Sequence, residues 1–215
     1  MSKAYTDSEF SSQILADRSW RLKEISDLKD AVKKADNVRQ KVLLRALVAI
    51  CYAHWEGYVK FAAKKYLEYV ALRKFQFKEL HRQFLRNYFL PRLASLSVSK
   101  SSIGQRCQLV DEILEGAERR FARVNEDTVS TKSNLNFEIF SDICLVCAVP
   151  IASFEDKETF IDVLLVKRRN EIAHGEETYL DLDDLDELTN ETIALMRAFG
   201  DALENHVYLR DYKAT

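Results

Sequence analysis

The feature that most constrains the fold of this chain is an unbroken stretch from 38 to 72, which contains no proline and one glycine, Gly57. Glycine and proline are the residues that most often interrupt a helix, so this stretch favours one long helix. The scarcity extends to the whole chain of 215 residues, which has five Gly and two Pro. Helices of such length occur mostly in bundles and coiled coils. The sequence therefore predicts an all-α fold.

Apolar residues recur at helical spacing in most of the remaining sequence. Besides 38–72, the pattern predicts helices at 10–34, 78–90, 105–121, 136–147, 156–173 and 183–207. Pro91 is expected to end the helix at 78–90, and the polar segments 95–104 and 124–136 are expected to be loops. Neither an internal repeat nor a low-complexity linker divides the chain, so we predict one domain over 1–215.

The charge of the chain is balanced overall but unevenly placed. The formal net charge of −2 gives no global attraction to nucleic acid. Residues 60–106 nevertheless carry eleven Lys and Arg against two acids, whereas residues 176–187 carry seven acids and no base. Such a polarised molecule can hold a polyanion on one side and exclude it from the other.

Several functional classes lack their sequence signals. The N-terminal segment has no apolar signal core, and no apolar run approaches the length of a membrane span, which predicts a cytoplasmic protein without membrane contact. No phosphate-binding, dinucleotide-binding or nucleophile-elbow motif occurs, and no cofactor is expected. Cys144 and Cys147 have the spacing of half a zinc site, but without a second pair they are interpreted as buried thiols, and no metal is predicted.

The stretch KRRNEIAHG, at 167–175, offers a candidate site at the end of a predicted helix. A cation and a histidine in the last turn can simply oppose the helix dipole, and Gly175 can end the helix. Arg169 and His174 are five residues apart, about 140° around a regular helix, so they do not share a face. They can converge if the helix ends near Ala173 or if two chains contribute to one pocket.

Arginine and histidine together suit cleavage of an RNA phosphodiester by its own 2′-hydroxyl. Histidine can take or give a proton near neutral pH, and arginine is a permanent planar cation that binds phosphate. The RRNEIAHG stretch resembles the R-x4–6-H motif of the HEPN superfamily. YAHWEGYVK, at 52–60, and SNLNFEIF, at 133–140, are similar to the MAE-type branch of HEPN-like nucleases, and the resemblance is strongest over 38–188.

The resemblance implies a HEPN-like helical bundle with a long early helix and extra loops, forming a homodimer with a composite active site. Two facing motifs would make a metal-independent endoribonuclease, in which His174 transfers the proton and Arg169 holds the phosphate. Asn170 would orient one of these groups or bind the RNA backbone. Glu56 is a further catalytic candidate, because an acid in an apolar helix segment needs a partner such as Arg169 or His174. A structural salt bridge explains Glu56 equally well. Neighbouring His54 and Trp55 are interpreted as core residues.

Basic residues outside the motif are candidates for RNA contact. The segment LRKFQFKELHRQFLRNYFLPRL interleaves cations with aromatic residues, as an RNA groove does, but an amphipathic helix with a solvated basic face has the same pattern. The candidate RNA-binding residues are Lys167, Arg168, Arg82, Arg86 and Arg92.

Three functions are compatible with these observations. The leading interpretation is an endoribonuclease that serves as a toxin of a toxin–antitoxin pair or in phage defence. The alternative is a non-catalytic HEPN-fold module that binds RNA, a nucleotide or a protein, and the third is a structural helical protein with a coincidental motif. The acidic run at 176–187 can be a helix-start cluster favoured by the dipole, or a contact for a basic antitoxin protein.

Overall fold

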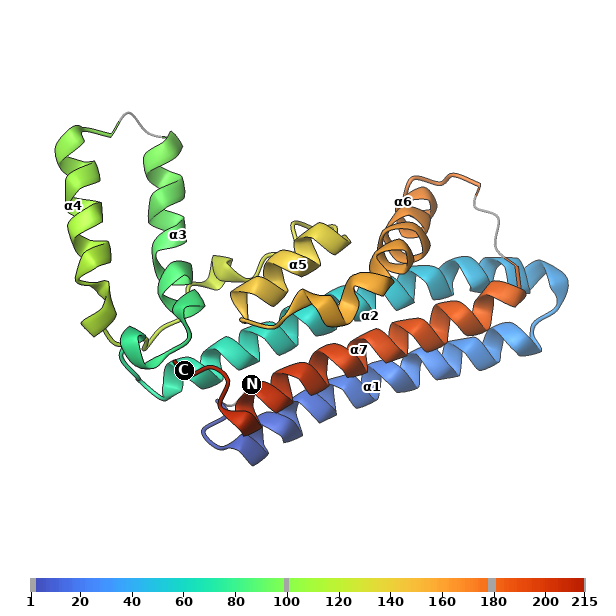
Figure 1. Ribbon diagram of the computed structural model, residues 1–215. Coiled ribbons are helices and arrows are strands. Elements are labelled where there is room, and N and C mark those ends of the chain that lie inside the picture. Colours follow the sequence, from blue (N-terminus) through green and yellow to red (C-terminus); the bar gives the residue numbers. More distant parts are fainter. Residues whose placement is uncertain (1–2, 99–100, 178–180, 215) are drawn as a thin grey trace.

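The computed structural model describes residues 3–98, 101–177 and 181–214 (Figure 1). The α-helices are α1 (Asp7–Lys34), α2 (Asn37–Leu72), α3 (Arg82–Val98), α4 (Ile103–Leu114), α5 (Phe137–Val146), α6 (Arg168–Ala173) and α7 (Asp183–Leu209). Short 3₁₀ turns and one π-helix, Phe160–Lys167, complete the helical structure. The described residues form two isolated β-bridges and no strand, which confirms the all-α prediction.

Three long helices, α1, α2 and α7, lie alongside one another and hold most of the core (Figure 1). The central helix is α2, which contacts both of the others and buries apolar side chains around most of its circumference. Capping residues fix where the long helices begin. Thr6 and Glu9 form a capping box at the start of α1, and the Asp36 side chain accepts a hydrogen bond from the backbone N–H of Arg39.

The short helices α5 and α6 lie on the opposite side of α2 from α1 (Figure 1). Trp55 of α2 is fully buried and packs against Phe140 of α5, with ring centroids 5.0 Å apart. The first N–H groups of α5 are satisfied by two side chains: Asn136 accepts from Ile139, and Asp162 of the π-helix accepts from Phe137 at 2.7 Å. These contacts fix α5 against both α2 and the chain that leads into α6.

The α3–α4 hairpin projects from the end of the bundle, and here two predictions were wrong (Figure 1). The helix at 78–90 begins at Arg82, because His81 and Ala214 form backbone hydrogen bonds that pair this part of the chain with the C-terminal segment. It continues through Pro91 to Val98. Pro91 is exposed and lacks the N–H that another residue at this position would donate within the helix. In the loop expected at 95–104, residues 95–98 belong to α3, Ser102 caps α4 and residues 103–104 begin α4, whereas residues 99–100 lie outside the described part.

The helix expected at 105–121 ends at Leu114. Gly116 follows, and a Cβ atom at that position would lie 2.7 Å from the Phe89 ring. The chain then pairs with residues after α2: the N–H of Phe121 donates to the carbonyl of Phe75, and the N–H of Phe77 donates to the carbonyl of Arg119. This pairing leaves no backbone groups for a helix over 119–121.

The predicted helix at 156–173 is three segments rather than one regular helix. A 3₁₀ turn, Ile151–Lys157, precedes the π-helix, and α6 begins at Arg168. A π-helix turns less per residue than an α-helix, so the change at Arg168 sets the direction in which the motif side chains point. The single domain predicted over 1–215 stays a prediction.

Two partly or wholly buried histidines make stability depend on pH. Burial lowers the pKa of both His54 and His206 below the ordinary value, although Glu24 beside His54 opposes the shift. The unfolded chain therefore binds more protons than the folded chain below about pH 6.5, so stability is lost as the pH falls from there. We expect the variant His54→Gln/His206→Gln to lose less stability between about pH 7 and pH 5.5, measured by urea midpoints. Parallel curves for variant and wild type would contradict this.

Candidate functional site

Arg169 is the second residue of α6, and its guanidinium is held on two sides. On one side, Nη2 donates to the backbone carbonyl of Ser133 at 3.2 Å and to the Asn134 side-chain oxygen at 3.1 Å. On the other, the guanidinium carbon lies 4.0 Å from the centroid of the Tyr52 ring. The Nε atom is buried without a hydrogen-bond partner. Hydrogen bonds and a ring contact of this kind fix a planar cation in one orientation.

Tyr52 is itself fixed by the segment that binds Arg169. Its hydroxyl accepts a hydrogen bond from the N–H of Leu135 at 2.7 Å. Burial raises the pKa of this hydroxyl, so Tyr52 stays protonated and neutral beside the cation. Helix α2, the loop before α5 and the start of α6 thus meet around one guanidinium. These are the three stretches of sequence that carry the motif resemblance.

Asn170, the next residue of α6, is half-buried and faces the loop that contains Asn134. Its Nδ2 is 3.5 Å from the side-chain oxygen of Asn134, at the limit for a hydrogen bond. Asn134 therefore faces both Arg169 and Asn170, and the link between these two motif residues runs through it. The role predicted for Asn170, to orient a catalytic group or to bind the RNA backbone, stays a prediction.

His174 is the C-terminal cap of α6 and is exposed. Gly175 follows in the left-handed conformation, with φ of 76°, as expected of the residue that ends this helix. The N–H of Glu176 closes the turn by donating to the carbonyl of Glu171 at 2.9 Å. Arg45 of α2 donates to the carbonyl of Glu176 at 2.9 Å and ties the turn to the bundle. The histidine backbone is therefore held in place.

The helix ends at Ala173, one of the two conditions under which Arg169 and His174 can converge. Within the described residues of one chain, however, no hydrogen bond joins their side chains. Arg169 faces α2, whereas His174 lies on the exposed turn. The geometry of a single chain thus provides an oriented cation and a free imidazole near each other in sequence, without a direct contact.

Comparison with known proteins identifies the family of this chain. The model of the RiboL-PSP-HEPN family matches residues 16–205, which is most of the chain. The chain belongs to the RiboL-PSP-HEPN family. Membership confirms the HEPN superfamily assignment and the HEPN-like bundle, although motif comparison had suggested the MAE-type branch. It supports a nuclease-like or RNA-binding HEPN module. Searches of curated proteins and of solved structures found no match.

Glu56 lies in this RiboL-PSP-HEPN protein where the sequence suggested, but without the expected partner. It lines an open cavity of about 370 Å³ together with Arg169, Tyr52, Ser133, Ala49 and Ala53. Within the described residues it forms no ion pair with Arg169 or His174, and no structural salt bridge either. The catalytic role predicted for Glu56 stays a prediction, and in the described part of the chain the residue shares with Arg169 only the lining of this cavity.

The cations predicted to bind RNA are divided between two places. Lys167 is exposed beside the motif, whereas Arg168 pairs with Asp184 of α7 at 3.1 Å. Arg82, Arg86 and Arg92 lie on α3, at the opposite end of α2 from α6 (Figure 1). Of these three, Arg92 is paired with Glu112 of α4. One chain does not bring the two groups together.

His54, Cys144 and Cys147 are buried, as the sequence indicated. His54 is 4% exposed, and its Nε2 lies 2.8 Å from the Glu24 carboxylate without the alignment of a hydrogen bond. Cys144 and Cys147 are buried thiols, and burial raises the pKa of both. In the described part of the chain, no group of three or more His, Cys, Asp or Glu is placed to hold a metal ion. No described helix combines the length and apolarity needed to cross a membrane.

Three residues of the site were not predicted. Tyr52 and Asn134 lie inside the motif stretches YAHWEGYVK and SNLNFEIF, so those stretches already pointed to them, although not to their contacts with Arg169. Arg45 lies seven residues before Tyr52, on the same side of α2, and carries no sequence signal. Its role depends on a backbone carbonyl that folding brings within reach.

Proposed function

We propose that this RiboL-PSP-HEPN protein is a metal-independent endoribonuclease. The single observation that carries the proposal is that Tyr52, Ser133 and Asn134 hold the guanidinium of Arg169 at an open cavity. We call these three residues the clamp. A cation fixed in advance stabilises charge that develops on a phosphate during reaction, without further reorganisation. A helix end that merely opposed its dipole would not need the ring of Tyr52 and two oxygen acceptors around one guanidinium.

In the proposed reaction, the 2′-hydroxyl oxygen of RNA attacks the adjacent phosphorus and the 5′ oxygen leaves. The products carry a 2′,3′-cyclic phosphate and a 5′-hydroxyl. His174 takes the proton from the 2′-hydroxyl, and Arg169 binds the non-bridging oxygens as negative charge builds on them. Asn170 keeps Asn134 in place, and Glu56 opposes displacement of Arg169 through its charge. Lys167 and Arg168 lie close enough to the motif to bind neighbouring phosphates.

The site is proposed to be composite, formed by two copies of the chain. The separation of Arg169 from His174 within one chain supports this, because a facing copy can supply the missing group. The partner subunit's His174 would then give a proton to the leaving 5′ oxygen. The purified protein should therefore run near twice 24.9 kDa in light scattering at micromolar concentration. A monomer that still cuts RNA would refute the shared site and leave the nuclease standing.

The biological role proposed is that of a toxin of a toxin–antitoxin pair or a phage-defence effector, acting in the cytoplasm. Exposed Glu176 and Glu177, together with the acidic start of α7, offer a surface for a basic antitoxin protein. Several acids of this run already have partners: Asp184 binds Arg168, and Asp186 binds Lys29 and Lys33. Residues 178–180 of the run lie outside the described part. Arg82 and Arg86 are proposed as additional RNA contacts, with Arg92 once released from Glu112.

A second candidate function is a HEPN-fold module that binds RNA, a nucleotide or a protein without cleaving. The observation in its favour is that Arg169 is engaged by Ser133, Asn134 and Tyr52, while His174 touches none of them. A pocket that only binds phosphate needs the cation and has no use for the histidine.

A cleavage assay in EDTA separates the two functions. Total tRNA and an unstructured RNA would be incubated with the wild-type protein, and the ends of the products would be analysed. Cleavage that leaves 2′,3′-cyclic phosphate and 5′-hydroxyl ends supports the nuclease. Intact RNA that is nevertheless bound supports the binding module, and cleavage that requires a divalent metal would contradict the proposed mechanism.

A further inference from the structure

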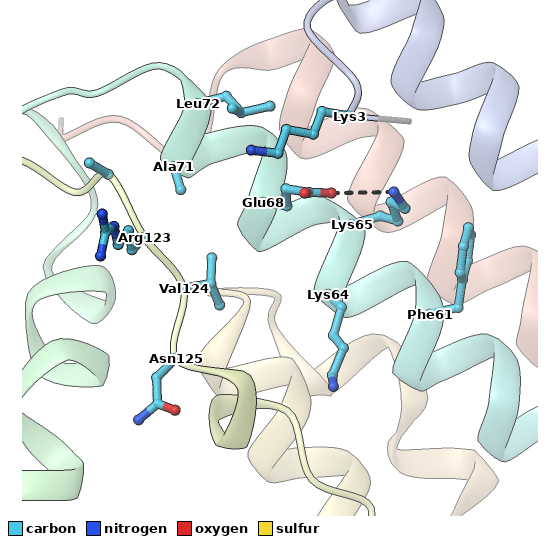
Figure 2. A pocket seen from close by; sticks show the side chains of 11 residues that line it. Lys3, Phe61, Lys64, Lys65, Glu68, Ala71, Leu72, Arg123, Val124 and Asn125 are labelled. Atoms are coloured by element: carbon cyan, nitrogen blue, oxygen red, sulfur yellow. Dashed lines mark hydrogen bonds and ion pairs between the residues drawn. The ribbon is translucent and has the colours of Figure 1, made fainter. Parts of the chain in front are cut away.

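Three cavities follow one another along a single face of α2. The first is the open cavity at Arg169. The second, of about 260 Å³, shares Ser133 with it and lies between α2 and residues 127–133. The third, of about 490 Å³, shares Lys64 with the second and lies between the end of α2 and residues 122–125 (Figure 2). Each neighbouring pair of cavities shares one lining residue, and we call the row of three cavities, which leads away from the candidate site, the α2 channel.

The spacing of the α2 residues explains why the three cavities lie in one row. Tyr52, Glu56, Lys60, Lys64 and Glu68 line the channel in turn, and residues four apart lie on the same face of a helix. At 1.5 Å per residue, the channel from Tyr52 to Leu72 extends about 30 Å along α2. Residues between 122 and 133 form the opposite wall. Ser133, at the end of this wall, and Asn134, which follows it, bind Arg169.

The α2 channel is basic, although the chain is slightly acidic. Its cations besides Arg169 are Lys3, Lys60, Lys64, Lys65, Lys132 and Arg123, against three carboxylates, Glu56, Glu68 and Asp127. Lys65 is paired with Glu68 at 3.2 Å. Lys60, Lys64 and Lys132 form no ion pair with any described residue, so their charges remain available to a ligand. Unpaired cations in a row along a wall attract an extended anion.

The far cavity differs from the rest of the channel in having an apolar floor. Phe61, Leu72 and Val124 line it, together with the polar residues Lys64, Arg123 and Asn125 (Figure 2). A flat aromatic or apolar floor accepts a nucleobase that has left its stack, and an amide can bond the base edge. Its volume of about 490 Å³ is in the range of small-molecule sites.

We propose that the α2 channel binds single-stranded RNA, with phosphates along Lys60, Lys64 and Lys132 and one unstacked base in the far cavity. This inference rests on the proposed function, since it names the substrate class of that site. A strand that enters the far cavity follows α2 and reaches the phosphate position at Arg169. Duplex RNA keeps its bases paired and stacked, so it cannot place a base on the floor at Phe61.

The test is binding of fluorescein-labelled single-stranded RNA, twelve nucleotides long, to the His174→Ala protein, which removes cleavage from the measurement. Anisotropy titrations at several salt concentrations would compare this background with the added pair Lys60→Gln/Lys64→Gln. We expect the pair to weaken binding about tenfold, and the slope of log K against log salt to fall by about 1.4, at roughly 0.7 per phosphate contact. A duplex of equal length should bind at least about tenfold more weakly than the single strand.

A matched control removes the same charge outside the channel. Lys23→Gln/Lys34→Gln alters two exposed lysines of α1, which line none of the three cavities. This control should bind the single strand like the background. Equal weakening by both pairs, or none by the channel pair, would overturn the α2 channel as the binding surface, and so would preferential binding of the duplex.

The outcomes are separable from those of the proposed nuclease. If the wild-type protein does not cleave but the channel pair alone weakens binding, the α2 channel stands and the nuclease falls. If the wild-type protein cleaves, and the channel pair cleaves and binds the single strand unchanged, the nuclease stands and the α2 channel falls. Circular dichroism of each variant would verify that the helical fold is retained.

Discussion

Replacing Arg169 with alanine should lower the rate of RNA cleavage by roughly two to three orders of magnitude. The guanidinium is proposed to stabilise the charge that builds on the phosphate, and no other described side chain occupies its place between Tyr52 and Asn134. The same substitution removes two hydrogen bonds and the contact with Tyr52, so we also expect a loss of stability of about 1–3 kcal/mol. Single-turnover rates in EDTA, with the fold verified by circular dichroism, measure the effect.

Matched variants separate charge, orientation and position. Arg169→Lys keeps the charge but loses the planar fork, so its rate should stay at least about tenfold below that of wild type. Asn134→Ala removes one oxygen that holds Arg169, and we expect an intermediate loss. Arg197→Ala removes an exposed arginine of α7 and should leave the rate unchanged. His174→Ala should lose about two to four orders of magnitude as the proton-transfer group is removed. Cleavage by Arg169→Ala at the wild-type rate would contradict the proposed mechanism.

The long helices could be predicted from the sequence because their signals are local. Absence of Pro and scarcity of Gly gave 38–72, and the structure begins α2 one residue earlier, at Asn37. The start of α1 was expected at Phe10 but lies at Asp7, since Thr6 and Glu9 form a capping box. That signal stands in the sequence as a threonine followed three residues later by glutamate.

Features that depend on distant partners escaped prediction. The late start of α3 follows from pairing with the C-terminal segment, and the early end of α4 follows from the contact of Gly116 with Phe89. The π-helix before α6 has no sequence pattern that distinguishes it from an α-helix. In the candidate site, the motif at 169–174 was local and visible. The contacts of the clamp could not be predicted, because Asn134 and Tyr52 reach Arg169 only after three separate segments fold together.

Charge patterning along the sequence does not show how far each cation lies from the motif. Counting cations along the chain drew attention to α3, yet α3 lies at the far end of α2 from the motif (Figure 1). Lys60 and Lys64 of α2 and Lys132 of the loop before α5 form no ion pair with any described residue. They come from two separate segments, so the sequence does not show that they line the same cavity. In the sequence, Arg92 looks available to bind RNA, but in the structure it forms an ion pair with Glu112.

Replacing Trp55 with alanine should lower the free energy of unfolding by about 3–5 kcal/mol. The side chain is fully buried and packs on Phe140, so its removal leaves a cavity between α2 and α5. For a chain of this size the melting temperature should fall by roughly 6 to 20 °C. Urea unfolding followed by circular dichroism gives the free energy directly.

Trp20 provides the matched control, since it is the same residue type but 50% exposed on α1. Its ring touches His54 edge-on, so Trp20→Ala should cost no more than about 1 kcal/mol. The two variants also differ in function. Phe140 belongs to α5, which begins three residues after Asn134 of the clamp. The cavity left by Trp55→Ala should therefore loosen Asn134 and slow cleavage, even where the protein remains folded. Equal losses of stability in both variants would mean that α5 is not anchored through Trp55, and the clamp would need another support.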